Sequence, residues 1–263
     1  MRISVGRYTY NVELVGPEKA PAVMLSHSLA TDLRMWQPQI DALGARHRLV
    51  LFDSLGHGGT DAPHGPYTLE EMAGDVVGLF DALGIGRAHF VGLSMGGMIG
   101  QTLALNAPGR LLSLALCDTT SRVPPEASSI WDERIRTALS QGMEPLVEPT
   151  IARWFTPHFR ERHPHTVETI ATMIRATSPV GYAGCCHAIA DLNLTARIKA
   201  IRVPTLILVG ADDPGTPVAA SEAIHAEIAG SRLEIIPSAA HLSNIEQAET
   251  FTRLLARHLA EAA

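Results

Sequence analysis

The chain is poor in cysteine, has no dense run of lysine and arginine, and contains no apolar run of about 18 residues that could span a membrane. Its three cysteines, Cys117, Cys185 and Cys186, are odd in number and two are adjacent, which favours neither a disulfide framework nor a metal cluster. The formal net charge of -6 argues against a nucleic-acid partner and a polybasic membrane anchor. The N-terminal residues alternate as in a strand and lack the apolar core of a signal peptide. We therefore expect a soluble, cytoplasmic protein without a membrane or nucleic-acid partner.

The chain is rich in apolar residues, and their pattern predicts its fold class. The 263 residues are 46% hydrophobic, which suits one α/β domain with an insertion. Apolar runs alternate with helix-period segments, a pattern typical of a mostly parallel sheet with helices on both faces. We expect eight strands, the first two antiparallel, at 3–5, 10–14, 22–26, 48–52, 88–92, 113–117, 205–209 and 232–236. The expected helices are 36–43, 69–83, 95–106, 219–228 and 245–260.

One long segment does not follow this alternation. Between about Val123 and Leu194 the strand pattern stops, and the sequence becomes helical, aromatic and punctuated by proline. We interpret residues 123–194 as a helical cap inserted after the sixth strand. The core then consists of residues 1–122 and 195–263.

The most informative motif is Gly-x-Ser-x-Gly at Gly92, Ser94 and Gly96. A strand-like segment precedes it and a helical segment follows it, which is the context of a nucleophile elbow. The two glycines leave room where a strand turns sharply into a helix. The helix that starts at Met95 directs its free amides and the positive end of its dipole at the same place, which suits an oxyanion. Ser94 is therefore the candidate nucleophile.

A nucleophilic serine needs a base and an acid that orients the base. In enzymes with this motif the acid follows the nucleophile in the chain and the histidine comes last. Asp212 and Asp213 end a buried strand, and we favour Asp213 as the acid, with Asp212 capping the turn before Pro214. Asp118, directly after the sixth strand, is the rival acid.

The candidate base is His241, which lies between the last strand and the last helix. His57, in a glycine-rich turn, is interpreted as structural, and His187 beside two cysteines as part of the packed core. The oxyanion hole needs two amide donors. We expect these to be the N–H groups of Met95 and of Leu29, in the loop after the third strand.

With these residues in place, the chain resembles the α/β-hydrolase superfamily over its full length, and within it the 3-oxoadipate enol-lactone hydrolases. The resemblance implies a hydrolase without cofactor or metal that opens the enol-lactone to 3-oxoadipate in the β-ketoadipate pathway of aromatic-compound breakdown. Three positions depart from the family pattern: His27, Ala30 and Leu55 stand where asparagine, glycine and arginine are usual. They border the pocket and bear on the substrate more than on the reaction type. The segments that carry the resemblance are 25–36, 56–60, 65–69, 92–101, 154–157, 181–186 and 240–244.

A substrate of this type carries a carboxylate, which requires a cation in the pocket. Our candidate is Arg134 in the cap, with Trp131 and Trp154 as further substrate-binding residues. Two alternatives stay open: a carboxylesterase, thioesterase, perhydrolase or lactonase with the same triad and another substrate range, and a small-molecule receptor of the same fold. Haloalkane dehalogenases and epoxide hydrolases are excluded because they need a carboxylate where Ser94 stands. The pattern indicates neither a protein partner nor an oligomeric state.

Overall fold

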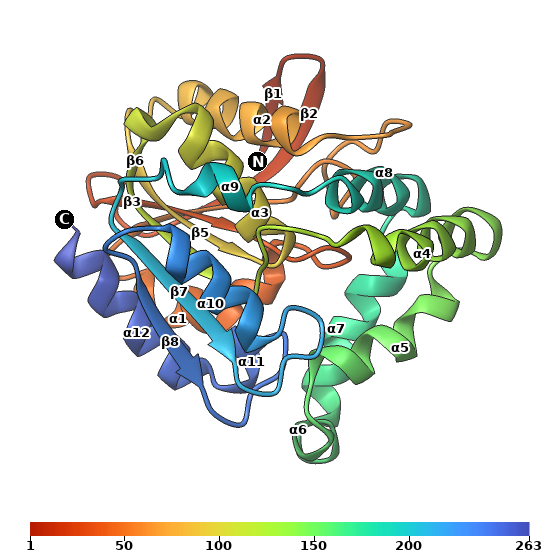
Figure 1. Ribbon diagram of the computed structural model, residues 1–263. Coiled ribbons are helices and arrows are strands. Elements are labelled where there is room, and N and C mark those ends of the chain that lie inside the picture. Colours follow the sequence, from red (N-terminus) through yellow and green to blue (C-terminus); the bar gives the residue numbers. More distant parts are fainter. Residues whose placement is uncertain (263) are drawn as a thin grey trace.

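The computed structural model describes residues 1–262, which form one sheet with helices on both faces (Figure 1). The strand order is β1-β2-β4-β3-β5-β6-β7-β8. β1 pairs with β2 and β2 with β4 in antiparallel register, and all other neighbours are parallel, so the predicted sheet is confirmed. The strands are β1 (Arg2–Val5), β2 (Tyr8–Val15), β3 (Ala22–Ser26), β4 (Arg48–Phe52), β5 (Ala88–Leu93), β6 (Leu111–Cys117), β7 (Thr205–Gly210) and β8 (Arg232–Ile236).

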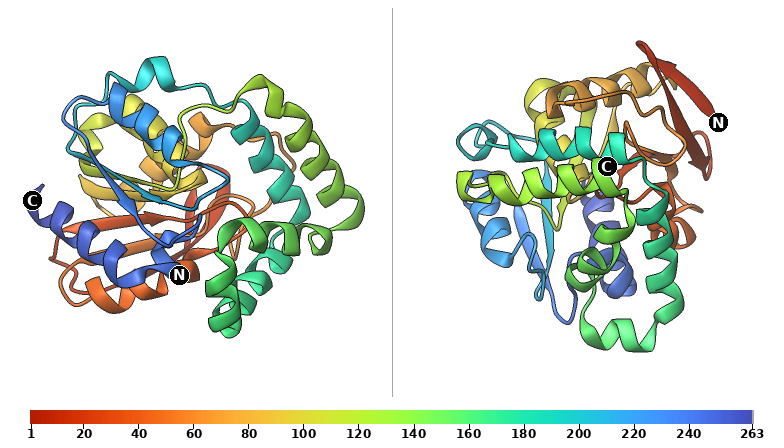
Figure 2. Two further views of the ribbon diagram at one scale, coloured as in Figure 1. Left: turned by 60° about the horizontal axis from the view of Figure 1, so that its bottom comes forward. Right: turned by 90° about the vertical axis from the view of Figure 1, so that its right-hand side faces the viewer.

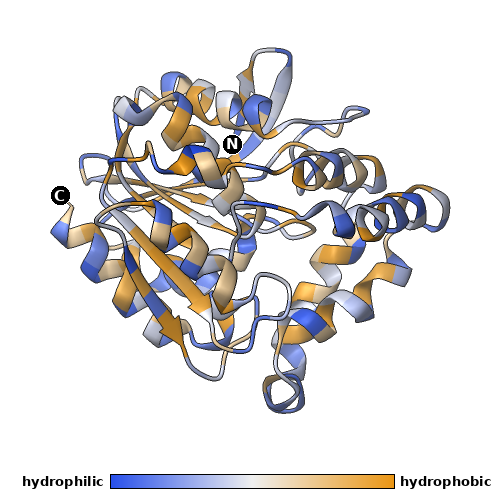
Figure 3. Cartoon of the chain, in the orientation of Figure 1, coloured by the Kyte–Doolittle hydropathy of each residue, from blue (hydrophilic) through white to orange (hydrophobic). Residues whose placement is uncertain are grey.

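The central strands are apolar on both sides because both faces of the sheet are covered. β3, β5 and β7 are buried along their whole length, and Figure 3 shows the hydrophobic colouring of β7. Mutual contacts group the helices of the core into two layers (Figures 1 and 2). One layer is α2 (Leu69–Ala82), α3 (Met95–Asn106), α9 (Thr195–Ile198) and α10 (Val218–Glu227), and the other is α1 (Gln37–Leu43), α11 (Ser243–Glu246) and α12 (Ala248–Glu261).

Five further helices, α4 to α8, lie between β6 and β7 in the chain and together at one side of the sheet (Figure 1, right). They are α4 (Ser128–Gln141), α5 (Glu144–Trp154), α6 (Pro157–Arg162), α7 (Pro164–Ala176) and α8 (Pro179–Ala190). An antiparallel bridge between Arg122 and Asn193 joins the two chain segments that enter and leave this helical cap. The limits 123 and 194 of the cap stay a prediction.

The last predicted helix, 245–260, is wrong at its beginning. The structure has a short helix, α11, and a separate helix, α12, with Gln247 between them at φ -124° and ψ 51°. The carboxylate of Glu246 accepts the backbone N–H of Ala240, and the side chain of Gln247 donates to the carbonyl of Ser238. These bonds to the preceding loop explain the break, which a helical pattern of apolar residues does not reveal.

A helix that crosses a membrane must be long and apolar. None of the helices within residues 1–262 combines the necessary length with the necessary apolar composition.

Candidate active site

Three loops at the carboxyl edge of the parallel sheet carry Ser94, Asp213 and His241. Ser94 directly follows β5, Asp213 lies just beyond β7, and His241 lies in the loop that follows β8. Since β5, β6, β7 and β8 are parallel neighbours, the loops after their carboxyl ends meet at one edge. Ligands of open α/β sheets bind at this edge.

Ser94 has a backbone conformation that few residues other than glycine adopt, with φ 55° and ψ -112°. The strained turn between β5 and α3 presents the side chain at the edge of the sheet. Its neighbours must be glycine: a Cβ atom on Gly92 would lie 2.1 Å from the carbonyl oxygen of Gly96, and one on Gly96 would lie 2.2 Å from that of Ser26. The geometry is that of a nucleophile elbow.

We expect Gly96→Ala to lower the free energy of unfolding by about 1–3 kcal/mol, because the added methyl group collides with backbone atoms that cannot move aside. Urea denaturation followed by circular dichroism measures the effect. Gly74→Ala is the matched control: it lies within α2 with open space around its Cα, and alanine there should raise stability by up to about 1 kcal/mol. Equal stability of the two variants would contradict the steric argument.

Asp213 and His241 form a buried pair. Asp213 Oδ2 lies 2.7 Å from His241 Nδ1, and both side chains are almost completely buried. The carboxylate is held from its other side, since Oδ1 accepts the N–H groups of Gly215 and Thr216 and Oδ2 accepts the hydroxyl of Thr216. With Nδ1 bonded to Asp213, Nε2 is the nitrogen left to act on Ser94.

The two groups shift each other's pKa in opposite directions. Burial alone would raise the pKa of Asp213, but the charge and hydrogen bond of His241 lower it below its ordinary value. Burial alone would lower the pKa of His241, but the charge and hydrogen bond of Asp213, with a further contribution from Asp118, raise it above its ordinary value. Asp213 therefore stays ionised and makes the imidazole a stronger base.

The neighbouring aspartate does not have the role that its position predicts. Asp212 is exposed, and its carboxylate accepts no hydrogen bond within residues 1–262, so the prediction that it caps the turn before Pro214 is wrong. Asp213 itself accepts the amides of that turn while it also contacts His241. Asp213 thus both caps the turn and contacts His241, because it is buried within the loop whereas Asp212 is exposed.

The rival acid, Asp118, lies close to the pair but does not contact the imidazole. It is fully buried, with φ 45°, and its two oxygens accept the N–H of Gly210 and the hydroxyl of Ser243, the latter at 2.5 Å. Burial, strengthened by the charge of Asp213, raises its pKa well above the ordinary value. Asp118 thus connects the loops that carry Asp213 and His241.

The two predicted oxyanion donors are both available. Met95 is the first residue of α3, so its N–H has no acceptor within the helix. Neither this N–H nor that of Leu29 donates a hydrogen bond within residues 1–262. Unpaired donors beside a serine nucleophile are what a developing oxyanion requires.

A cavity of about 560 Å³ lies in front of the serine. Its lining includes Leu29, Ser94, Trp154 and His241. Asp213 and Met95 are not among the residues that line the cavity. Asp213 is bonded to His241, which does line it, and Met95 directly follows Ser94 in the chain. No hydrogen bond joins Ser94 Oγ to His241 in the part of the chain that the structure describes; apo sites commonly have such loose geometry before substrate binds.

Two arginines of the cap line the same cavity. Arg134 lies over the ring of Trp131, with 4.6 Å between Cζ and the ring centroid. Arg153 donates to the hydroxyl of Thr150, and neither guanidinium forms an ion pair with a carboxylate within residues 1–262. Burial and the charge of Arg134 lower the pKa of Arg153. Arg153 was not among the residues predicted from the sequence, although its position next to Trp154 in the cap was a usable signal.

The cap contacts His241 directly. The rings of Trp154 and His241 are stacked with 6.1 Å between centroids, and the N–H of Leu242 donates to the carbonyl of Trp154. Glu246 strengthens this contact, since its carboxylate accepts both the N–H and the hydroxyl of Thr156 as well as the N–H of Ala240. Sequence reasoning missed Glu246, because nothing local marks a glutamate that reaches another segment.

The remaining candidates of the sequence form no hydrogen bond to Ser94, Asp213 or His241 within residues 1–262. His187 is exposed, whereas Cys185 and Cys186 are buried in α8, so the interpretation of His187 as a core residue is wrong. On a helix, successive side chains point in different directions, which separates His187 from the cysteines. His57 is buried beside Cys185, and its ring accepts the N–H of Ala30.

Comparison with known proteins agrees with this geometry. The sequence profile of the alpha/beta hydrolase fold family matches residues 21–248. The chain therefore belongs to the α/β-hydrolase fold family, and the predictions of the fold class and of a hydrolase are confirmed.

Particular relatives narrow the similarity. The chain is 36% identical to 3-oxoadipate enol-lactonase 2 of Acinetobacter baylyi over 92% of this chain and 89% of the relative. It is 30% identical to a putative carbamate hydrolase, RutD, of Variovorax paradoxus over 94% of this chain and 95% of that one.

Among solved structures, the enol-lactonase from Burkholderia xenovorans LB400 is 38% identical and has a TM-score of 0.95, with 99% of this chain and 100% of that chain covered. A thermophilic esterase from Thermogutta terrifontis is 30% identical with a TM-score of 0.95, covering 100% of this chain and 99% of that one.

Proposed function

We propose that this protein is a serine hydrolase that opens 3-oxoadipate enol-lactone to 3-oxoadipate. Ser94 acts as nucleophile, His241 as general base and Asp213 as the group that orients the base. The observation that carries the proposal is the pair of cap arginines without acidic partners in the cavity that Ser94 and His241 also line. The similarity to enol-lactonases supports it. The reaction belongs to the β-ketoadipate pathway.

In the first half of the reaction, His241 Nε2 takes the proton from Ser94 as the serine oxygen bonds to the lactone carbonyl carbon. Asp213 holds the proton on Nδ1 and stabilises the imidazolium. The N–H groups of Leu29 and Met95 donate to the carbonyl oxygen as it becomes negative. The ring C–O bond then breaks, and the enol oxygen takes the proton from His241. The product of this half is an acyl-enzyme.

In the second half, water attacks the acyl carbon and gives a proton to His241. The bond from the carbon to Ser94 then breaks, and the serine regains its proton from the imidazole. The released chain carries a carboxylate at each end, and its enol tautomerises to the ketone of 3-oxoadipate. Because an enol is a good leaving group, positioning of the ring contributes most to the rate.

The cap arginines are suited to the carboxylate that the lactone carries from the start. Arginine is always charged at neutral pH and binds carboxylates through two parallel N–H groups. Stacking on Trp131 fixes the plane of the Arg134 guanidinium, so less freedom is lost when an anion binds. Trp154, stacked on His241, contributes an apolar surface to the same cavity.

We expect Arg134→Gln and Arg153→Gln each to lower kcat/KM for the enol-lactone by about 10- to 100-fold, mainly through KM, because each removes a charged hydrogen bond to the substrate. Steady-state kinetics on the enol-lactone and on neutral p-nitrophenyl acetate measure the effect. The neutral ester should change less than about threefold. Arg136→Gln is the matched control, since Arg136 is an exposed residue of α4 outside the cavity. An unchanged KM for the anionic lactone in both cavity variants would refute this use of the arginines.

The substrate is tested by following the ultraviolet absorbance of 3-oxoadipate enol-lactone beside a panel of p-nitrophenyl esters. Fast opening of the enol-lactone with slow ester cleavage is the expected result. Efficient ester cleavage with an inert enol-lactone would favour the second candidate, an ester hydrolase of broad range, which the similarity to the Thermogutta esterase supports. Tight ligand binding without turnover of either would favour a receptor.

A further inference from the structure

Two buried histidines outside the triad connect the loops after β3 and β4 to each other. His27, in the first loop, accepts the backbone N–H of Ser54 in the second at 2.9 Å through Nε2. His57, in the second loop, accepts the backbone N–H of Ala30 in the first, also at 2.9 Å through Nε2. The rings lie 5.2 Å apart between centroids. Each loop therefore supplies an imidazole to a backbone amide of the other.

The hydrogen bonds define the protonation of both rings. Nδ1 of His27 lies 2.7 Å from the carbonyl oxygen of Ser28, and Nδ1 of His57 lies 3.2 Å from that of Leu55. A carbonyl only accepts, so Nδ1 carries the hydrogen in both rings, and Nε2 is free to accept. Burial, followed by the influence of His27, lowers the pKa of His57 to about 3. Both imidazoles therefore accept a backbone N–H through Nε2.

The residue enclosed by these bonds is Leu29, one of the two oxyanion donors of the proposed mechanism. On one side, the carbonyl of Ser28 accepts the side chains of His27 and Thr31. On the other side, Ala30 has φ 61°, a left-handed conformation that is strained for an alanine, and its N–H donates to His57. The peptide groups around Leu29 are thus fixed, while the N–H of Leu29 is free and the residue lines the cavity.

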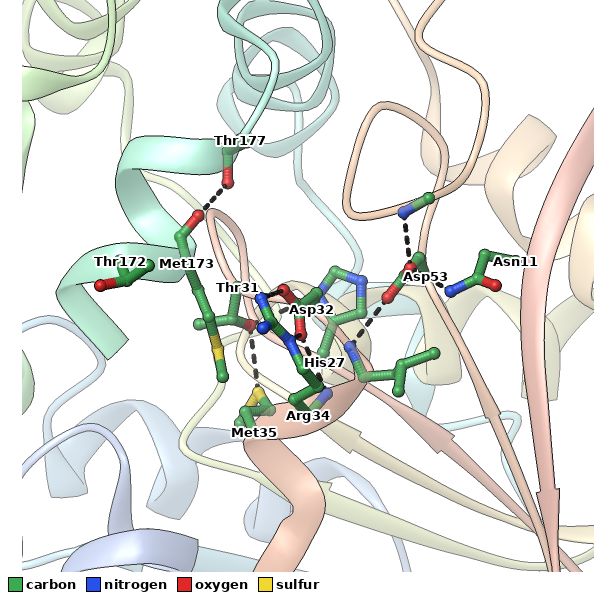
Figure 4. A network of polar contacts seen from close by, with 12 residues as sticks. Asn11, His27, Thr31, Asp32, Arg34, Met35, Asp53, Thr172, Met173 and Thr177 are labelled. Atoms are coloured by element: carbon green, nitrogen blue, oxygen red, sulfur yellow. Dashed lines mark hydrogen bonds and ion pairs between the residues drawn. The ribbon is translucent and has the colours of Figure 1, made fainter. Parts of the chain in front are cut away.

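The second loop is itself firmly anchored. Asp53 Oδ1 accepts the N–H of Leu33, and Oδ2 accepts the N–H of Gly59 and the side-chain amide of Asn11, each at 2.8 Å. Figure 4 shows these bonds around Asp53, with His27 and Thr31 alongside. Because the second loop is anchored, His57 has a fixed position, and its bond to the N–H of Ala30 fixes the first loop as well.

We infer that His57 and His27 are positioning residues of the oxyanion hole, whose paired bonds to Ala30 and Ser54 aim the N–H of Leu29 at the reacting carbonyl oxygen. The inference rests on the proposed use of Ser94 and Leu29. It does not depend on which ester or lactone is the substrate. It gives His57 a function beyond that of the structural turn residue expected from the sequence.

Two variants of His57 test the inference. His57→Gln keeps an acceptor near the position of Nε2, whereas His57→Leu removes it. With p-nitrophenyl acetate, we expect His57→Leu to lower kcat about 100-fold with KM within about threefold, because a displaced oxyanion donor costs that much in the transition state. His57→Gln should recover at least about a tenth of the wild-type kcat. Affinity for phenylboronic acid, which forms a tetrahedral anion on the serine, should fall in parallel with kcat.

A matched control separates positioning from stability. His258, buried on α12, bonds through Nε2 to the carbonyl of Leu114 in β6, and neither residue lines the cavity. His258→Leu should lower Tm but leave kcat and boronate affinity unchanged. If His57→Leu does not fold, the pair His27→Gln and His27→Leu makes the same comparison from the other loop.

Three results would overturn the inference: a His57→Leu variant that loses only Tm, a His57→Gln variant as inactive as His57→Leu, or a parallel loss in His258→Leu. A wild-type protein that cleaves the ester and binds the boronate but ignores the enol-lactone would refute the proposed substrate alone. A wild-type protein that cleaves neither the ester nor the enol-lactone and does not bind the boronate would refute both proposals.

Discussion

Replacing Ser94 by alanine should lower kcat for opening of the enol-lactone, and of any ester the protein cleaves, by about 10⁶-fold. The expected loss is large because the serine oxygen forms the covalent bond of the acyl-enzyme, and without it His241 and the oxyanion donors have no nucleophile to act on. Ultraviolet-monitored turnover with wild type and variant at equal concentration measures it. Residual activity would come only from water in a site that still stabilises the oxyanion.

The loss should be chemical rather than structural. The hydroxyl of Ser94 forms no hydrogen bond within residues 1–262, and alanine keeps the Cβ atom of the elbow, so Tm should change little. Ser221→Ala is the matched control, because Ser221 is also a buried serine with an unpartnered hydroxyl, but it lies on α10. It should keep full activity. A Ser94→Ala variant with kcat within about tenfold of wild type would contradict the mechanism, whatever the substrate.

The fold could be predicted because its signals are local. Each buried strand is a short apolar run bounded by turn residues, and β3, β5 and β7 are buried at every position. The one helix predicted wrongly, 245–260, fails where Glu246 and Gln247 bond to a loop rather than continue the helix. Side-chain bonds of that kind depend on tertiary contacts.

The candidate triad could be predicted for a related reason. Ser94, Asp213 and His241 each follow a strand, so one feature of the chain, the end of an apolar run, points to all three. Parallel pairing then brings strand ends that are distant in the sequence to one edge. Even here the sequence divided two roles between Asp212 and Asp213 that the structure gives to one residue.

Contacts between distant segments of the chain could not be predicted from the sequence. Glu246 binds Thr156 across 90 positions of the chain, and Asp118 binds Ser243 across 125. His57 reaches Ala30 across 27. A glutamate, an aspartate or a histidine in a loop has no local pattern that reveals which distant amide or hydroxyl it will meet, so these connections appear only once the loops are assembled.

The second large effect concerns the pair behind the serine. Asp213→Asn should lower kcat about 10⁴-fold, because asparagine in that place favours the wrong tautomer of His241 and cannot stabilise the imidazolium. His241 must be neutral to accept the serine proton, so wild-type kcat/KM should fall as the pH drops through the raised pKa of His241. Without Asp213 that raising influence is lost while burial still lowers the pKa, and the acid limb should move to lower pH.

Asp118→Asn distinguishes this effect from a general loss of negative charge. Asp118 contributes to the raised pKa of His241 but contacts Gly210 and Ser243 rather than the imidazole, so its variant should move the acid limb in the same direction with far less loss of kcat. Profiles of kcat/KM against pH for the three proteins measure both quantities. If Asp118→Asn instead lost about 10⁴-fold in kcat while Asp213→Asn lost far less, Asp118 would be the acid of the site, and Asp213 a structural residue that caps its own turn.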